Sequence, residues 1–214
     1  SYILGINSFH GDASACILKD GVLIAAAEEE RFLRVKHWAG FPKESISYCL
    51  NEAGVSLSEV NAVAINSDPK ANYFRKIIHV LRYRVDFALV KDRLLNSEAR
   101  KTVAQSLEES FPDQRFCGKI RHINHHMAHL ASAFYVSPYK ESAVVSIDGF
   151  GDFSSGAWGV GRGKEIKIDG RVLFPHSLGI FYQALTQYLG FPHYGDEYKV
   201  MGLAPYGEAK YLKE

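Results

Sequence analysis

The chain has 214 residues, enough for one large domain or two small lobes. Its composition, 47% hydrophobic and 23% charged, is typical of a globular protein and excludes a disordered chain. A formal charge of +1 gives no strongly basic character for binding nucleic acid, and no apolar run approaches the ~20 residues that span a bilayer. Three widely spaced cysteines exclude a disulfide framework and, with no signal peptide evident, indicate a cytoplasmic protein.

The first part of the chain predicts short strands over residues 2–7, 13–18 and 22–27. The turn between the first two contains His10 and Asp12, and an Asp20-Gly21 pair typical of a hairpin joins the next two. A helix is expected over residues 43–54, ending at Gly54, and a strand over residues 60–66. Residues 70–111 lack glycine and are expected to be helical with a basic bias, to which we assign no function.

The second part of the chain predicts a similar series of elements. We expect a strand at 119–124, a helix at 125–136, a strand at 142–147, a glycine-bearing turn at 148–152, and strands at 155–162 and 165–174. The Asp169-Gly170 pair is expected to form a turn. A helix over 177–190 begins at Ser177 as N-cap and ends at Gly190, and residues 195–207 are expected to form an ordered loop.

Residues 2–27 and 142–174 share one pattern of three strands with polar turns, each copy followed by a helix. Such a repeat predicts a duplicated α/β fold, although coincidence among hairpins remains an alternative. The pattern is similar to the actin-like and sugar-kinase-like (ribonuclease H-like) fold, which implies a nucleotide cleft between the first turns of the two copies. The chain would then hold the first lobe and the start of the second lobe.

Four of the nine histidines fall between residues 122 and 129. On a helix, His125 and His129 share one face at a spacing that suits two ligands of one metal ion, and imidazole suits Fe, Zn, Ni or Cu. His122 and His126 lie off that face. The motif lacks the glutamate of metalloprotease helices, which disfavours a hydrolase of that type. A carboxylate must complete the site, and Asp148 is the best local candidate.

Three further features suggest phosphate or acid–base chemistry. The small residues of 148–152 would let backbone N–H groups approach a phosphate closely. His10, in the matching turn of the first copy, is a candidate general base. Lys199 is the cation of the 195–207 run, where a phosphate could be held.

Together these residues resemble the NodU/CmcH-type O-carbamoyltransferase family. The resemblance covers residues 3–207, with a divergent stretch near 67–117, and its motifs occur in the family's order. The matching segments are GINSFHGDASACIL, EEERFLRVKH, NHHMAHLASAFYVSPY, SIDGFGD, HSLGIFYQALTQYLGF and YKVMGLAPYG.

The resemblance implies a two-domain enzyme that uses ATP and carbamoyl phosphate. Residues 1–140 would form the first lobe of the N-terminal domain, with a helical insertion near 67–117, and 141–214 the start of the second lobe. A C-terminal adenylate-forming domain would lie beyond residue 214, so the chain is expected to be an inactive fragment. That domain would make a carbamoyl-adenylate, whose carbamoyl carbon a substrate hydroxyl attacks as AMP leaves.

The resemblance also implies roles for individual residues. His125, His129 and Asp148 would bind a divalent ion, either Fe or Zn. His10 would assist deprotonation of the acceptor hydroxyl. The remaining family positions are Gly149 and Gly151 near phosphate, Lys199, Met201 and Gly202 on the nucleotide side, and Arg31 and His37 as candidate substrate or phosphate contacts.

The expected partner is a hydroxyl-bearing small molecule such as a nodulation oligosaccharide, an antibiotic core or another secondary metabolite. We expect no nucleic acid or membrane partner, and a homodimer through residues 67–117 is an open alternative. Competing functions are a small-molecule kinase of the same superfamily, a non-catalytic metal- or nucleotide-binding module, and a tRNA-modifying relative. The paired histidines disfavour the kinase, and EERFLRVKH disfavours the tRNA-modifying relative.

Overall fold

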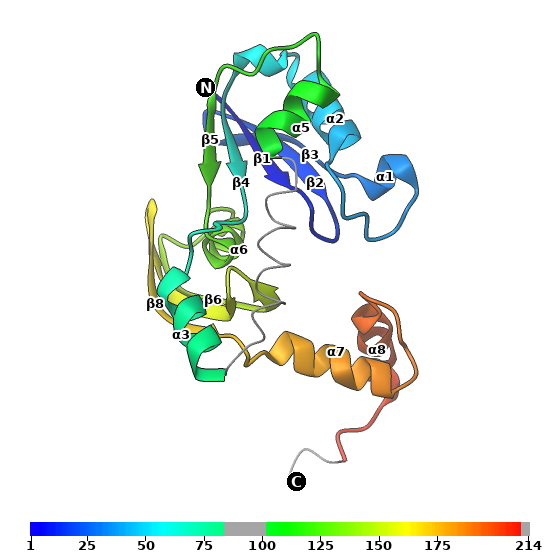
Figure 1. Cartoon of the computed structure of the whole chain (residues 1–214). Coiled ribbons are helices and arrows are strands. Elements are labelled where there is room, and N and C mark those ends of the chain that lie inside the picture. The colour runs from blue at the N-terminus through cyan, green and yellow to red at the C-terminus, as the bar shows by residue number, and fades with distance from the viewer. Residues whose placement is uncertain (84–101, 211–214) are drawn as a thin grey trace. The chain divides into compact units, whose positions relative to one another are not determined.

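The computed structural model describes residues 1–83 and 102–210 (Figure 1). It divides into two compact units, Ser1–His125 (unit 1) and His126–Glu214 (unit 2). Each unit has its own sheet and its own group of buried side chains. Within the described residues, no helix combines the length and the apolar character that crossing a membrane requires.

Unit 1 is built on a five-stranded mixed sheet. The strands are β1 (Tyr2–Asn7), β2 (Ser14–Lys19), β3 (Val22–Glu28), β4 (Val60–Ile65) and β5 (Lys119–His122). Their order in the sheet is β3-β2-β1-β4-β5, and only β2 runs antiparallel to the other four. This order and direction are those of the ribonuclease H-like fold that the sequence predicted.

The described part of unit 1 contains the helices α1 (Glu30–Leu33), α2 (Lys43–Ala53), α3 (Tyr73–Tyr83) and α5 (Val103–Ser110), and the 3-10 turn η1 (Leu57–Glu59). α2 packs against β2 and β3 and ends at Gly54, whose φ of 64° places it in the left-handed region. α3 and α5 confirm two parts of the helical stretch expected over 70–111. Residues 84–101 lie outside the described part of the chain.

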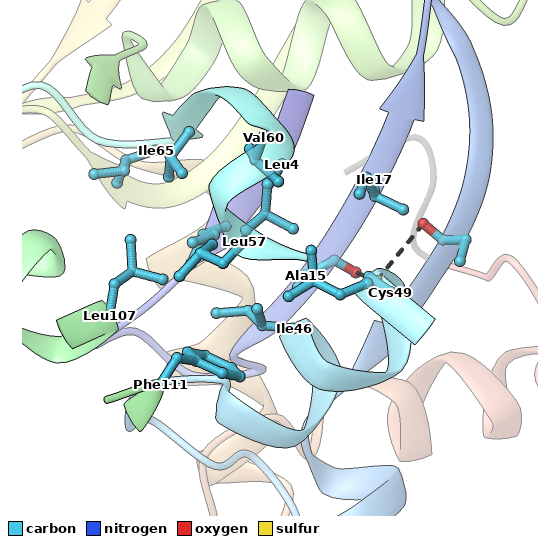
Figure 2. Packing of buried hydrophobic residues seen from close by; sticks show 14 residues of the cluster. Leu4, Ala15, Ile17, Ile46, Cys49, Leu57, Val60, Ile65, Leu107 and Phe111 are labelled. Atoms are coloured by element: carbon cyan, nitrogen blue, oxygen red, sulfur yellow. Dashed lines mark hydrogen bonds between the residues drawn. The ribbon is translucent and has the colours of Figure 1, made fainter. Parts of the chain in front are cut away.

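Alternating strand residues and one face of α2 form the core of unit 1 (Figure 2). Leu4, Ile17, Ile46 and Leu107 in this core are each 0% exposed. Cys49 lies among them and donates from its Sγ to the carbonyl oxygens of Ala15 and Ala25. Burial, with a smaller effect of the neighbouring Cys16, raises the pKa of the Cys49 thiol to about 12. This cysteine is therefore a core residue rather than a nucleophile.

Unit 2 contains the second copy of the strand pattern. Strands β6 (Glu141–Gly151), β7 (Ser154–Arg162) and β8 (Glu165–Leu173) form an antiparallel sheet in that order. The helices are α6 (His125–Phe134), which begins at the boundary of the units, α7 (Leu178–Tyr188) and α8 (Glu197–Leu203), followed by the 3-10 turn η2 (Ala204–Tyr206). Both copies are antiparallel meanders, as the duplicated α/β fold requires.

Close contacts at glycines fix how unit 2 packs. A Cβ at Gly161 of β7 would lie 2.7 Å from the Phe134 ring, so the absence of a side chain lets α6 sit directly on the sheet. The Trp158 ring covers Gly170 in the same way on the neighbouring strand. In unit 1 the Trp38 ring covers Gly40. Each unit thus has one tryptophan packed on a glycine.

The structure corrects two turns predicted in the second copy. Strand β6 continues through Asp148 and Gly149, and the turn consists of Asp152 and Phe153, with φ of 51° and 66°. Two left-handed residues suffice for a tight hairpin. The Asp169-Gly170 pair lies inside β8, opposite a register shift after Trp158. It marks a β-bulge, and the chain turns near Gly163 instead.

The structure also corrects two assignments of helix and loop. Residues 195–207, expected as a loop, contain α8 and η2. Their turn-forming Gly195 and Gly207 flank these helices instead of interrupting them. The short helix α1 was not expected at all, because four residues are too few to show a periodic pattern. The other predicted elements lie within a few residues of their observed bounds.

Candidate metal centre

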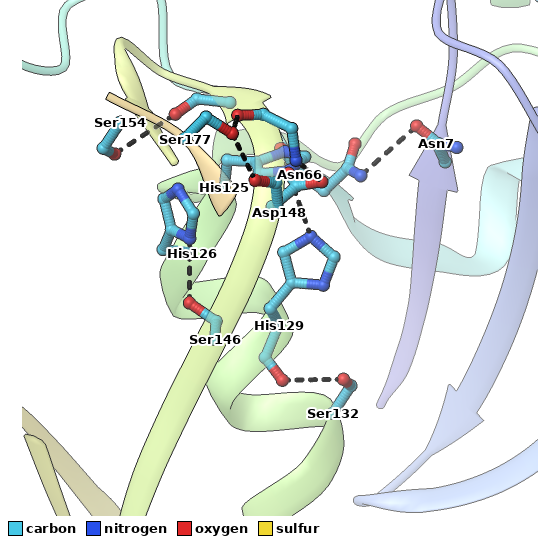
Figure 3. Close-up of polar contacts among 12 residues, drawn as sticks. Asn7, Asn66, His125, His126, His129, Ser132, Ser146, Asp148, Ser154 and Ser177 are labelled. Carbon is cyan, nitrogen blue, oxygen red and sulfur yellow. Dashed lines mark hydrogen bonds and ion pairs between the residues drawn. The ribbon is translucent and has the colours of Figure 1, made fainter. Parts of the chain in front are cut away.

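Helix α6 and strand β6 bring together the three residues that the sequence singled out for metal binding (Figure 3). His125 and His129 lie one turn apart at the start of α6, and Asp148 lies toward the end of β6. One ligand atom from each residue falls within 4.8 Å of the others. The His129 Nε2 and Asp148 Oδ2 atoms are 3.7 Å apart. The three side chains therefore converge on one point.

The chemistry of this group fits a divalent cation. Ligand atoms that bind one ion at about 2.0–2.2 Å lie roughly 3–4.4 Å from one another, so small side-chain adjustments would suffice here. Two imidazoles and a carboxylate suit Fe or Zn and leave coordination positions open for water or substrate. The His129 side chain is 49% exposed and that of Asp148 is 31% exposed, which leaves the group accessible from solvent.

The His125 ring is oriented by the loop that follows β4. Its Nδ1 lies 3.1 Å from the carbonyl oxygen of Asn66. When Nδ1 carries the proton and donates to this carbonyl, Nε2 is left as the metal-binding nitrogen. Asn66 is held in turn, because its Nδ2 donates to Oδ1 of Asn7 at 3.2 Å. No local sequence pattern predicts a role for either asparagine.

The two neighbouring histidines lie outside this group. His126 is 0% exposed, and its Nδ1 lies 2.8 Å from the Ser146 hydroxyl of β6. This contact joins α6 to β6 close to His129 and Asp148. The Nδ1 of His122 lies 2.8 Å from the carbonyl oxygen of Ser67.

The two oxygens of the Asp148 carboxylate have different surroundings. Oδ1 accepts a hydrogen bond from the Gly149 amide at 2.7 Å, whereas Oδ2 faces His129. The Gly149 N–H is therefore already hydrogen-bonded to the Asp148 carboxylate. Gly149 and Gly151, predicted to approach phosphate from a turn, both lie in strand β6.

The turn that carries His10 is held from within. His10 is exposed in the connection between β1 and β2. Asn7, at the end of β1, donates from Nδ2 to the carbonyl oxygens of Asp12 at 2.9 Å and Gly11 at 3.3 Å. Phe9 and Asp12 both have a φ of 61°, so the backbone on either side of His10 is left-handed. Strained residues of this kind are frequent at functional sites.

His37 contacts the same turn. Its Nδ1 lies 2.8 Å from Asp12 Oδ1, and its amide donates to the Glu30 carboxylate at 3.3 Å. The structure thus places His37 beside the turn that carries His10. Arg31 is exposed on α1 and forms an ion pair with Glu28 at 3.4 Å.

Glu29 has a structural role that the sequence did not reveal. It is 1% exposed. Its Oε1 accepts from the Glu44 amide at 3.0 Å, and its Oε2 accepts from the Ser45 amide at 2.8 Å and hydroxyl at 2.7 Å. The carboxylate therefore caps the N-terminus of α2, where the helix dipole favours a negative charge. A capping residue so distant along the chain leaves no local sequence signal.

The predicted nucleotide-side residues lie on α8. The Lys199 ammonium lies 2.6 Å from Oδ1 of Asp196 and within 5.9 Å of the centre of the Phe191 ring. This hydrogen bond raises the pKa of Lys199 and lowers the pKa of Asp196. Met201 and Gly202 are exposed on the same helix.

These features define a mixed α/β protein with a ribonuclease H-like sheet, a repeated meander and a histidine–carboxylate group on one helix and one strand. Residues 2–213 match the family model described as the carbamoyltransferase N-terminus. The chain belongs to this family, as its motifs indicated.

Three similar proteins are considerably longer than this chain. An uncharacterized protein of Synechocystis is 39% identical over 219 residues, which cover 99% of this chain and 36% of the relative. Nodulation protein NolNO of Sinorhizobium fredii is 37% identical over 203 residues, covering 94% of this chain and 28% of the relative. Nodulation protein NolO of Bradyrhizobium diazoefficiens is 49% identical over 94 residues, covering 43% of this chain and 17% of that protein. The chain thus spans about a third of the length of the first two relatives.

Among solved structures, YeaZ from Pseudomonas aeruginosa aligns with 82% of this chain and 68% of its own. The TM-score is 0.42 and the sequence identity 19%. The fold assignment made above rests on the strand order and direction of the sheets themselves.

Proposed function

We propose that this chain is the metal- and nucleotide-binding part of an O-carbamoyltransferase. The observation that carries the proposal is the convergence of His125, His129 and Asp148 in a chain whose residues 2–213 match the carbamoyltransferase N-terminus. The donors would be ATP and carbamoyl phosphate, joined through a carbamoyl-adenylate made by an adenylate-forming domain of the same polypeptide. The acceptor would be a hydroxyl of a small molecule.

The transfer step replaces one bond at the carbamoyl carbon with another. The acceptor oxygen forms a bond to the carbamoyl carbon, and the bond from that carbon to the AMP phosphate oxygen breaks. AMP leaves with the electron pair, and the hydroxyl proton passes to a base. We assign His10 as this base, because it is exposed in a turn whose backbone Asn7 holds in place.

A metal ion bound at this site would act on the carbamoyl-adenylate near its phosphate. His125, His129 and Asp148 would hold a divalent ion, which supplies a positive charge for the phosphate or carbonyl oxygen of the adenylate. Fe and Zn both suit these ligands. Because the His129 side chain is half exposed and that of Asp148 is partly exposed, a ligand can reach the open coordination positions from solvent.

The remaining assignments concern binding. We propose that Lys199, with Met201 and Gly202, lies on the nucleotide side, with Asp196 keeping its ammonium charged and in place. Gly149 and Gly151 would let a phosphate approach β6 without a side chain in the way. Arg31 and His37 are proposed as contacts of the acceptor or of phosphate, and the Asp12 carboxylate orients the His37 ring.

The first test measures nucleotide products with the full product of the gene that encodes this sequence. ATP is incubated with and without carbamoyl phosphate, for the wild type and for the double variant His125→Ala/His129→Ala. We expect AMP and pyrophosphate only when carbamoyl phosphate is present. The double variant should still form pyrophosphate but should transfer no carbamoyl group to an acceptor, because the adenylate is made elsewhere in the polypeptide.

Two results would contradict the proposal in different ways. ADP formed without any need for carbamoyl phosphate would indicate a kinase of the same superfamily. A double variant that transfers carbamoyl groups as well as the wild type would remove the histidines from the reaction. His122→Ala is the matched control, since its ring contacts the Ser67 carbonyl and lies outside the metal group.

A further inference from the structure

The peptide unit between Asp148 and Gly149 is fixed by the start of helix α7 (Figure 3). Ser177, the N-cap of α7, accepts a hydrogen bond from the Ile180 amide at 3.1 Å, as an N-cap serine does. The same hydroxyl lies 3.0 Å from the carbonyl oxygen of Asp148 and 2.8 Å from that of Gly149. Its single proton is therefore shared between two carbonyls of β6.

The orientation of this peptide unit bears directly on the candidate metal ligand. The Asp148 carbonyl and the Gly149 amide belong to one rigid plane. The amide donates to Oδ1 of Asp148, so the plane sets the rotation of the carboxylate. With Oδ1 held, Oδ2 is the oxygen that faces His129.

The backbone of α7 lies against the same plane. A Cβ at Gly179 would be 2.5 Å from the backbone carbonyl oxygen of Asp148, 2.6 Å from the carbonyl carbon of the same residue and 2.7 Å from the Gly149 amide nitrogen. All three atoms belong to the one peptide unit. A side chain at position 179 would therefore have to displace it.

We propose that Ser177 and Gly179 are positioning residues for the metal ligand Asp148. Ser177 holds the Asp148–Gly149 peptide unit through the Asp148 carbonyl and the following peptide unit through the Gly149 carbonyl. Gly179 lets α7 approach closely enough for these contacts. Ser177 and Gly179 thereby orient Oδ2 of Asp148 toward the ion, and neither residue contacts the ion itself. This inference rests on the metal site of the proposed function. Groups that orient a metal ligand typically contribute 10–100-fold to metal affinity.

The test is a titration of this chain with Co²⁺, followed by its visible absorption and by calorimetry. We expect Ser177→Ala and Gly179→Ala each to weaken Co²⁺ affinity by roughly 10–100-fold. Ser177→Thr keeps the hydroxyl and should bind as the wild type does. The two weakening variants change α7 in opposite directions, because one loses a helix cap and the other gains helix propensity. A shared loss of affinity therefore does not follow from helix stability.

Matched controls separate positioning from general destabilisation. Thr102→Ala removes the N-cap of α5, which accepts from the Gln105 amide in unit 1. Gly207→Ala places a Cβ in unit 2 with its nearest neighbour at an ordinary 3.4 Å. Both should leave Co²⁺ affinity within about twofold of the wild type, although Thr102→Ala lowers the melting temperature.

The outcomes distinguish this inference from the proposed function. If Asp148→Asn abolishes binding while Ser177→Ala and Gly179→Ala bind like the wild type, the positioning role is overturned and the metal site stands. If the wild type and His129→Ala take up Co²⁺ equally, the metal site itself is wrong, and the positioning role is overturned with it. A Ser177→Thr variant as weak as Ser177→Ala would also contradict the role given to the hydroxyl.

Discussion

The ion pair formed by Asp196 and Lys199 makes the stability of unit 2 depend on pH. Their charged atoms lie 2.6 Å apart, and only 7% of the Asp196 side chain is exposed. The hydrogen bond from Lys199 lowers the pKa of Asp196, and the same bond raises the pKa of Lys199. The folded chain thus favours the charged form of both groups.

The sign of each shift predicts how stability changes with pH. The contribution of Asp196 is present above the ordinary carboxyl pKa of about 3.9 and is lost as pH falls through the lower folded value. That of Lys199 is present below the ordinary pKa of about 10.4 and is lost as pH rises through the higher folded value. Asp196→Asn should therefore flatten the plot of unfolding free energy against pH at both ends.

Urea unfolding at a series of pH values tests this prediction. The matched control is Glu208→Gln, which removes one side of an exposed ion pair with Lys210 at 3.1 Å. We expect the control to follow the wild type, since exposed pairs contribute little. Parallel profiles for Asp196→Asn and the wild type would show that the Asp196 pair does not set the pH response.

At the scale of single elements, helix α2 depends on a charge that comes from outside it. The Glu29 carboxylate accepts three hydrogen bonds from Glu44 and Ser45 at the first turn of α2. Glu29→Gln keeps the shape of the side chain but turns one acceptor into a donor that faces an N–H group. The expected loss is about 2 kcal/mol of unfolding free energy.

The Glu29 prediction is checked by the midpoint of urea unfolding. Glu28→Gln is the matched control, because Glu28 is adjacent in sequence but exposed and pairs only with Arg31 at 3.4 Å. That variant should change the free energy by less than about 0.5 kcal/mol. If both variants unfold at the same urea concentration, the cap does not stabilise α2.

The elements that the sequence predicted well are those whose pattern involves residues close together in the chain. Strand alternation and the i, i+4 spacing of His125 and His129 depend on residues close together in the chain, so the two-copy pattern and this histidine pair could be predicted. Asp148 could be named as the candidate carboxylate because it directly follows the expected strand 142–147. The turn at Asp152 and Phe153 could not be predicted, because a phenylalanine such as Phe153 is not typical of a left-handed backbone. The contacts of Glu29 and Ser177 join residues that are 16 and 29 positions apart, which no local pattern reveals.

At the scale of the whole molecule, α7 exposes an unusual amount of apolar surface. Leu178 is 65% exposed, Phe181 61% and Tyr188 87%. Exposed apolar groups on this scale favour association with another surface. We expect the chain to self-associate as its concentration rises, and Phe181→Ser/Tyr188→Ser to reduce this association.

Sedimentation velocity over a range of concentrations measures the effect. Val22→Ser is the control, because Val22 is similarly exposed, at 64%, but belongs to unit 1. It should leave the association of the wild type unchanged. A wild-type chain that sediments as a monomer at every concentration would contradict the prediction.

The positions of the two tryptophans give the chain a built-in spectroscopic reporter for each unit. Trp38 packs on Gly40 in unit 1, and Trp158 packs on Gly170 in unit 2. The sequence contains no other indole. Fluorescence of a variant with either ring replaced by phenylalanine would follow one unit alone. A comparison of the two signals during denaturation would reveal whether the two units unfold in one cooperative transition or one after the other.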